Sequence, residues 1–164
     1  MLAVIYEQLV ASNLFEVVGL VSGLLCVWLL IKESIWTWPI GLVYTLVSLV
    51  VFFQAKLYSE FGLHIYYAAM NAYGWYYWSR MGAEESTIPV TIIKARTAYI
   101  LLAISLITVV ALAELMTRFT DAEMAYPDAL ITTLSFVAMW MTARKLLESW
   151  YVWFLVDVIA TVVY

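Results

Sequence analysis

The sequence predicts an all-α protein whose helices cross a membrane repeatedly, and two observations carry this prediction. Of its 164 residues, 66% are hydrophobic and only 12% are charged, with a mean hydropathy of +0.94, whereas soluble domains average about half apolar and a quarter charged. The apolar residues also form long runs without the alternation of barrel strands. This composition excludes a soluble enzyme, a disordered chain and a nucleic-acid-binding protein, which needs a basic face. The single cysteine, Cys26, excludes an internal disulfide and a cysteine-cluster metal site.

Six apolar runs predict six transmembrane helices, because about 20 residues cross roughly 30 Å of hydrocarbon. The first contains Gly19 and Gly23, a spacing that allows close helix approach within the bundle or between protomers. The second has Pro39 in its first turn, where a missing N–H costs nothing. The third holds His64 and Asn71, the fourth is the most hydrophobic and the fifth is shorter. In chain order the runs cover 14–31, 38–55, 61–79, 97–113, 129–143 and 149–164.

The last run is short for a span. Its 16 residues give about 24 Å of helix, and it ends on Val-Val-Tyr without a polar flank. A carboxylate inside the bilayer costs several kcal/mol. We therefore expect the sequence to stop within a span, with a seventh helix to follow.

Lys and Arg residues of the short loops predict the orientation, because cytoplasmic loops are enriched in them. The N-terminal side carries Lys56 and Arg118. The opposite side carries six such residues: Lys32, Arg80, Lys94, Arg96, Arg144 and Lys145. We expect the N-terminus outside and the opposite side in the cytoplasm. Residues 1–13 hold no Lys or Arg and so lack the basic region of a signal peptide.

A weak internal repeat relates the first two runs to the last two. A shift of 112 residues aligns Trp38 with Trp150. A shift of 113 residues aligns three other pairs: Ser22 with Ser135, Lys32 with Lys145, and Tyr44 with Asp157. Four spans separate the copies, so both have the same orientation, as in transporters built from parallel repeats. We expect a 3+1+3 bundle in which the fourth helix is a connector.

Polar and aromatic groups share one face of the last run. Trp150, Trp153, Asp157 and Thr161 lie at offsets of 3, 7 and 11, which fall on one side of a helix. Indole rings attract a flat cation by about 0.5–2 kcal/mol, and a carboxylate supplies a counter-charge. Because an Asp at the centre of a span costs roughly 2.5–3.5 kcal/mol on insertion scales, we interpret Asp157 as substrate-binding. Taken alone, Trp150 fits an interfacial aromatic belt better than a ligand contact.

The third run carries a matching stripe at intervals of three and four residues. With one residue of the second run, its expected substrate contacts are His64, Tyr67, Asn71, Trp75 and Tyr44. His64 and Asn71 would also be explained by hydrogen bonds between helices without any substrate. The ends of the stripe, Glu60 and Trp78, are interpreted as interfacial anchors.

The sequence holds no pattern typical of catalysis. A Ser–His or His–Glu set at defined spacing, a zinc-protease motif and a phosphate-binding loop are all missing from it. We expect no enzymatic activity, cofactor or metal. Polar groups lining a membrane bundle favour passage or binding of a small molecule.

Several segments resemble the PnuC family of vitamin transporters. They are Trp38-Pro39-Ile40-Gly41-Leu42-Val43, Ala55-Lys56-Leu57-Tyr58, Ile65-Tyr66-Tyr67, Tyr73-Gly74-Trp75-Tyr76-Tyr77-Trp78, Met141-Thr142-Ala143-Arg144-Lys145 and the Trp-x-x-Trp-x-x-x-Asp run. The resemblance covers essentially the whole chain. It implies a 3+1+3 parallel-repeat fold and facilitated diffusion of an unphosphorylated vitamin, above all nicotinamide riboside, which a cytoplasmic kinase traps by phosphorylation.

The chain departs from the family pattern at two points. That pattern ends with a seventh helix carrying an aromatic Gly-Tyr-x-x-Trp type segment, which this sequence lacks. Nicotinamide riboside transporters of the family typically have Asn in place of Asp157 and often Gln in place of His64, at substrate-facing positions. Relatives in the family carry thiamine or riboflavin. Nicotinamide riboside and thiamine both contain a cationic aromatic ring that suits a carboxylate beside two indoles, whereas riboflavin is neutral.

These interpretations predict a multi-pass carrier of the bacterial inner membrane for an unphosphorylated vitamin. Nicotinamide riboside is preferred, thiamine is the alternative that Asp157 favours, and a non-transporting membrane subunit is the other class. The expected partners are the vitamin, the lipid bilayer and, functionally, a vitamin kinase, without nucleic acid; a homo-oligomer stays open. The expected domains are a first three-helix repeat at 1–79, a connector with the fourth helix at 80–127, and the start of a second repeat at 128–164.

Overall fold

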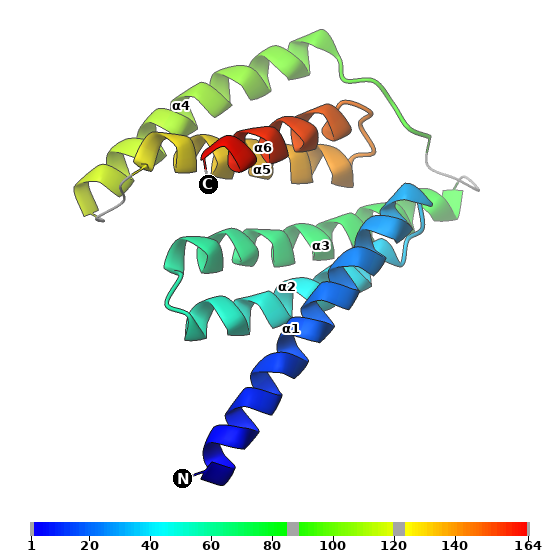
Figure 1. Cartoon of the computed structure of the whole chain (residues 1–164). Coiled ribbons are helices and arrows are strands. Elements are labelled where there is room, and N and C mark those ends of the chain that lie inside the picture. Colours follow the sequence, from blue (N-terminus) through cyan, green and yellow to red (C-terminus); the bar gives the residue numbers. More distant parts are fainter. Residues whose placement is uncertain (1, 85–88, 120–123, 164) are drawn as a thin grey trace. The chain divides into compact units, whose positions relative to one another are not determined.

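A computed structural model of the chain describes residues 2–84, 89–119 and 124–163, which form six helices in the predicted order (Figure 1). The apolar runs became helices because a helix satisfies its own backbone hydrogen bonds in lipid. The all-α fold is therefore confirmed. The helices are α1 (Leu2–Ile31), α2 (Thr37–Gln54), α3 (Tyr58–Glu84), α4 (Ala95–Phe119), α5 (Ala125–Ala143) and α6 (Ser149–Val163).

Within the described residues, two helices are long and apolar enough, by length and composition, to cross a membrane. They are α2 over its whole length and α4 over Ala95–Arg118. Val17–Ile31 and Ser149–Val163 are shorter apolar segments. Polar and aromatic residues along α3 lower its hydropathy, and these are the residues from which the sequence predicts a binding site.

The chain divides into two compact units, Met1–Ser86 and Thr87–Tyr164. In the first unit, α2 packs against both α1 and α3; in the second, α5 packs against both α4 and α6. The fourth helix thus packs with the helices that follow it. The three-part division with a separate connector stays a prediction.

Small residues let the helices of the first unit approach closely. A Cβ added to Gly23 would lie 3.3 Å from the Tyr44 ring, and one added to Gly19 would lie 3.7 Å from Val47. The Gly19-x-x-x-Gly23 face of α1 therefore packs on α2 within the unit.

A second close approach joins α2 to α3. A Cβ on Gly74 would overlap the Trp38 ring, which also meets Trp78 edge-to-face at a centroid distance of 5.3 Å. Trp78 is only 4% exposed. The interpretation of Trp78 as an interfacial anchor is therefore wrong, because the glycine opposite lets α2 and α3 bury both indoles.

The turn between α1 and α2 recurs, bond for bond, between α5 and α6. Ser34 N–H donates to the Leu29 carbonyl at 2.9 Å, and Leu146 N–H donates to the Met141 carbonyl at 3.0 Å. The central residues of the two turns, Glu33 and Lys145, have φ of 53° and 52°. All these pairs are 112 residues apart, so the turns select the shift of 112 over the shift of 113. Each turn is a Schellman motif, which satisfies the last carbonyls of a helix.

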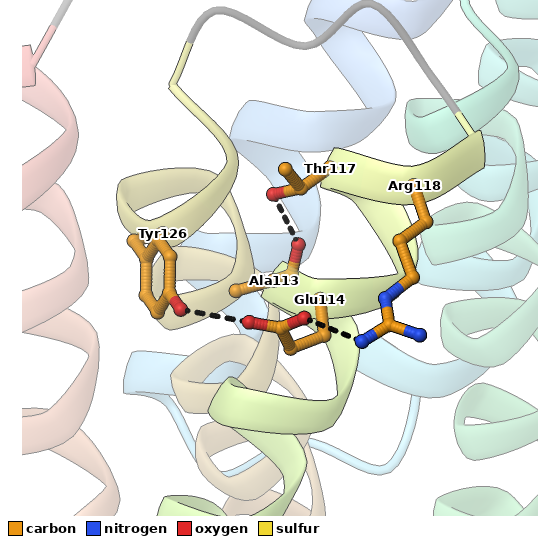
Figure 2. A network of polar contacts seen from close by, with 5 residues as sticks. All are labelled: Ala113, Glu114, Thr117, Arg118 and Tyr126. Carbon is orange, nitrogen blue, oxygen red and sulfur yellow. Dashed lines mark hydrogen bonds and ion pairs between the residues drawn. The ribbon is translucent and has the colours of Figure 1, made fainter.

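Polar contacts hold both ends of α4 against the rest of its unit. Before its first turn, Ile93 N–H donates to the Glu148 carboxylate at 3.1 and 3.2 Å, and Thr91 pairs with Leu146 as a single β-bridge. At the other end, the Tyr126 hydroxyl donates to Glu114 at 3.2 Å, and Glu114 also pairs with Arg118 (Figure 2). The fourth helix is thereby tied to α5 and to the α5–α6 turn.

Candidate functional site

Aromatic rings surround His64 inside the first unit. The imidazole is 5% exposed, and its ring centroid lies 4.7 Å from Phe52, 5.3 Å from Tyr67 and 6.0 Å from Tyr44. Two of these rings come from α2 and one from α3. The predicted residues His64, Tyr67 and Tyr44 therefore lie together.

The helix backbone orients the imidazole of His64. Its Nδ1 lies 2.9 Å from the Glu60 carbonyl, which can only accept a hydrogen bond, so Nδ1 donates. In the neutral ring, Nε2 then keeps its lone pair and acts as an acceptor. This buried Nε2 has no hydrogen-bond partner among the described residues. It presents a polar atom inside an aromatic surround.

Asn71 lies at the crossing of α2 and α3. Its amide nitrogen donates to the Tyr67 carbonyl at 2.9 Å, and its side chain is 4% exposed. A Cβ on Gly41 would overlap its Oδ1 atom, so the absence of that carbon makes room for the amide. One turn before Gly41, the buried Trp38 indole nitrogen has no partner in the described part of the chain.

In the second unit, the sequence-predicted Trp153 is anchored to α5. Its Nε1–H donates to the Thr142 hydroxyl at 3.0 Å, and that hydroxyl donates to the Ala138 carbonyl at 2.9 Å. Trp153 is partly buried and is less exposed than Trp150, which is 46% exposed. One tryptophan of the pair is thus held by a neighbouring helix.

Two other predicted residues lie further along α6, both exposed. The Thr161 hydroxyl donates to the Asp157 backbone carbonyl at 2.7 Å, so its hydrogen is committed to its own helix. Asp157 itself is also an exposed residue. On α3, Trp75 is 47% exposed and lies outside the aromatic surround of His64. Because successive helical residues turn by about 100°, Trp75 leaves the face on which Gly74 meets Trp38.

The structure thus brings His64, Tyr67 and Tyr44 together in the first unit, whereas Trp75 lies outside this group. In the second unit, the four predicted residues follow one another along α6: Trp150, Trp153, Asp157 and Thr161. A single site that unites them stays a prediction. Sequence reasoning missed Phe52, which lies eight residues beyond Tyr44 and so shares its helical face. It also missed Thr142 as a partner of Trp153. Among the side chains described, no group of three His, Cys, Asp or Glu could hold a metal ion.

Known proteins similar to this chain are transporters. The family described as "Nicotinamide mononucleotide transporter" matches residues 13–164. The nicotinamide riboside transporter PnuC of Escherichia coli K12 is 28% identical over 91% of this chain and 73% of its own length. The riboflavin/roseoflavin transporter RibM of Streptomyces davaonensis is 32% identical over 88% of this chain and 68% of its own.

The fold is also that of a solved transporter. The crystal structure of the vitamin B3 transporter PnuC superposes with a TM-score of 0.74 at 22% identity, covering 99% of this chain and 71% of that one. At this identity the likeness speaks for the fold. It agrees with the all-helical arrangement built above from the hydropathy runs.

Proposed function

This chain belongs to the nicotinamide mononucleotide transporter family, and we propose that it carries an unphosphorylated vitamin with a cationic aromatic ring by facilitated diffusion. Nicotinamide riboside is the first candidate, and thiamine is the second. The observation that carries the proposal is the stripe of α6 in which a carboxylate, Asp157, follows an anchored indole, Trp153.

The internal repeat supports the interpretation of this stripe as a ligand surface. In the shift of 112 residues, Trp153 and Asp157 take the places of Gly41 and Thr45, both of which are buried on α2. Gly41 permits a helix to approach closely, because even one added carbon would overlap Asn71. An indole at that position prevents such an approach. A wide ring and a carboxylate at these positions therefore suit a flat cation better than a closely packed helix.

The substrate stacks on Trp153, and Asp157 balances its positive charge. The attraction of a cation for an indole face is about 0.5–2 kcal/mol, larger when water is excluded. His64, Asn71, Tyr67, Tyr44 and Trp75 of the first unit, with Trp150 and Thr161 of the second, complete the proposed cage. Because His64 Nε2 is an acceptor, it binds a hydroxyl or amino hydrogen of the ligand. Hydroxyl groups of a ribose and the amino group of thiamine both provide one.

The two relatives are named for different vitamins, so the choice of vitamin for this chain rests on the chemistry of the proposed site. The relatives transport nicotinamide riboside in one case and riboflavin or roseoflavin in the other. Riboflavin is neutral and gains little from Asp157. A pyridinium or thiazolium ring gains more, and the carboxylate is the feature that brings thiamine into consideration.

The proposed transport cycle requires only rearrangement of the two repeats around one central site. The carrier sits in the bacterial inner membrane with its N-terminus outside, the vitamin enters from that side, and the repeats rock to release it inside. A vitamin kinase in the cytoplasm then traps it. Coupling to an ion is not part of the proposal.

Uptake by proteoliposomes tests the proposal. Purified protein should equilibrate labelled nicotinamide riboside or thiamine across the liposome membrane, and Asp157→Ala should reduce uptake at least about ten-fold, which corresponds to roughly 1.4 kcal/mol. Asp128→Ala, which removes a carboxylate from α5, is the matched control and should retain uptake. Wild-type uptake by Asp157→Ala would exclude this site. Tight binding without any uptake would instead identify a non-transporting membrane subunit.

Titration of tryptophan fluorescence discriminates between the vitamins. Nicotinamide riboside, thiamine and riboflavin are added separately to detergent-solubilised protein. The proposal expects saturable quenching by one of the two cationic vitamins at concentrations where riboflavin has little effect. Preferential binding of riboflavin would contradict the role given to Asp157.

A further inference from the structure

The indole of Trp153 is fixed by a hydrogen-bond chain that crosses from α6 to α5. Its Nε1–H donates to Thr142 Oγ1 at 3.0 Å, and the Thr142 hydroxyl donates to the Ala138 carbonyl at 2.9 Å. An indole nitrogen only donates, whereas a hydroxyl both donates and accepts. The Trp153 nitrogen must therefore donate to the Thr142 oxygen. Because a carbonyl only accepts, the Thr142 hydroxyl must donate to Ala138.

Thr142 suits this role because its own side chain is buried and hydrogen-bonded. It is 8% exposed on α5, and its hydroxyl bonds the carbonyl four residues earlier. A β-branched side chain in a helix has few accessible rotamers. Thr142 therefore offers its remaining lone pair from a fixed position, and the bond restricts rotation of the Trp153 ring about its side-chain torsions.

The first unit shows that this bond is not needed to form the helix hairpin. In the shift of 112 residues, the counterparts of Thr142 and Trp153 are Leu30 and Gly41, neither of which can make such a bond. The turn between α1 and α2 nevertheless has the same backbone hydrogen bonds as the turn between α5 and α6. The hydrogen bond between Thr142 and Trp153 therefore orients the indole and is not required to form the hairpin.

We propose that Thr142 is a positioning residue for substrate recognition: it holds the Trp153 ring in the plane on which the cationic ring of the vitamin stacks. This inference rests on the proposed function. Thr142 acts through Trp153 and does not itself contact the substrate. A ring that is already held in place loses less side-chain freedom when the substrate binds.

A double-mutant cycle between Thr142 and Trp153 tests the inference. Thr142→Val keeps the shape and removes the hydroxyl, Thr142→Ser restores it, and Trp153→Phe keeps an aromatic face without the N–H. Binding of labelled nicotinamide riboside and thiamine is measured by equilibrium dialysis on detergent-solubilised protein, and uptake in proteoliposomes. Thr117→Val is the matched control, because the Thr117 hydroxyl bonds the Ala113 carbonyl of its own helix in the same way.

We expect Thr142→Val to raise Kd and the KM of uptake about five-fold, the change expected from one hydrogen bond, with the maximal uptake rate unchanged. Thr142→Ser should bind within about two-fold of wild type, because it keeps the hydroxyl. In the Trp153→Phe background, Thr142→Val should have no further effect. Independently, the indole N–H resonance of Trp153 in ¹⁵N-tryptophan-labelled protein should shift in Thr142→Val and stay in place in Thr117→Val.

Three results would overturn the inference. One is an unchanged Kd and an unshifted Trp153 resonance in Thr142→Val. Another is a five-fold loss that persists in the Trp153→Phe background, because it would identify a packing effect of α5. If wild-type protein binds neither vitamin, the proposed function fails and this role for Thr142 fails with it, a result distinct from the first two.

Discussion

The α1–α2 hairpin and the α5–α6 hairpin share one turn but expose their second helices differently. Residues 112 apart make the same backbone hydrogen bonds in both turns. On α2, Trp38 and Thr45 are each 2% exposed beneath neighbouring helices. On α6, the counterpart Trp150 is 46% exposed and Asp157 is also exposed. In the first hairpin, α3 packs over α2, whereas among the described residues α6 packs only against α5.

The two second helices also differ in the residues that occupy matching positions of the repeat. Small and neutral residues on α2, Gly41 and Thr45, allow α3 to pack closely and leave no charge to be solvated. The corresponding residues on α6 are an indole, which takes far more room than glycine, and a carboxylate, which is costly to bury without a cationic partner. The backbone of the turn is insensitive to this exchange because its hydrogen bonds involve only main-chain atoms.

The largest expected effect comes from exchanging the residue types of Thr45 and Asp157, which are 112 residues apart and so occupy the same position in the two hairpins. Thr45 is buried, and its hydroxyl lies 3.0 Å from both the Gly41 and the Leu42 carbonyl oxygens. Thr45→Asp would bury a carboxylate without a cationic partner beside carbonyl oxygens, so we expect a loss of at least about 3 kcal/mol in the free energy of unfolding. Asp157→Thr should change it by no more than about 0.5 kcal/mol, although vitamin binding falls. Thermal unfolding in detergent measures both, and equal destabilisation would contradict the comparison.

Glycine substitutions on α2 and α3 should have the next largest effect. A Cβ at Gly41 would overlap Asn71, and a Cβ at Gly74 would overlap Trp38. Because this packing has no space for another carbon, Gly41→Ala and Gly74→Ala should each destabilise the first unit by about 1–3 kcal/mol. A Cβ added to Gly62 would meet no neighbouring group within 4 Å in the described part of the chain, so Gly62→Ala is the control and should be neutral or stabilise α3. Equal melting temperatures for all three variants would show that α2 and α3 are not closely packed.

A smaller effect is expected where the two hairpins differ in the turn itself. Glu148 accepts the Ile93 N–H, whereas its counterpart Trp36 is 65% exposed. Glu148→Ala removes a charge-assisted hydrogen bond and should cost about 1–2 kcal/mol. Amide hydrogen exchange at Ile93 is expected to accelerate about ten-fold, the factor that corresponds to roughly 1.4 kcal/mol. Trp36→Ala should leave exchange in the first turn unchanged, and similar changes in both turns would contradict a role specific to Glu148.

The sequence predicts the helices better than it predicts their contacts. Apolar runs such as 38–55 became Thr37–Gln54 with a shift of one residue at either end, because hydropathy and helix formation respond to the same residues. The repeat register stayed open between 112 and 113, since few identities survive between apolar helices. The turn hydrogen bonds decide it. Side chains of the same apolar character, by contrast, give no sign of which neighbour they meet.

Site residues illustrate the same limit. His64 and Tyr67 lie three residues apart on α3, so their proximity follows from helical periodicity. Phe52 completes the surround from another helix, and hydropathy alone does not distinguish it from a lipid-facing ring. Thr142 meets Trp153 only because the α5–α6 turn brings together residues 11 apart. Such contacts depend on the path of the turn. Its left-handed residue is Lys145 and not the usual glycine, so the sequence gives no sign of that path.

The smallest expected effect concerns the strained residue that both turns share. Glu33 has a φ of 53°, a left-handed conformation that costs an ordinary residue roughly 1–2 kcal/mol and glycine much less. Glu33→Gly should therefore raise the free energy of unfolding by up to about 1 kcal/mol, because the relief of strain exceeds the added freedom of the unfolded chain. Lys32→Gly, one residue earlier, should lower it by about 0.5–1 kcal/mol, since glycine there gains no such relief. Thermal unfolding of the two variants side by side measures the difference, and destabilisation by both would mean that Glu33 does not hold the left-handed conformation through which the two hairpins correspond.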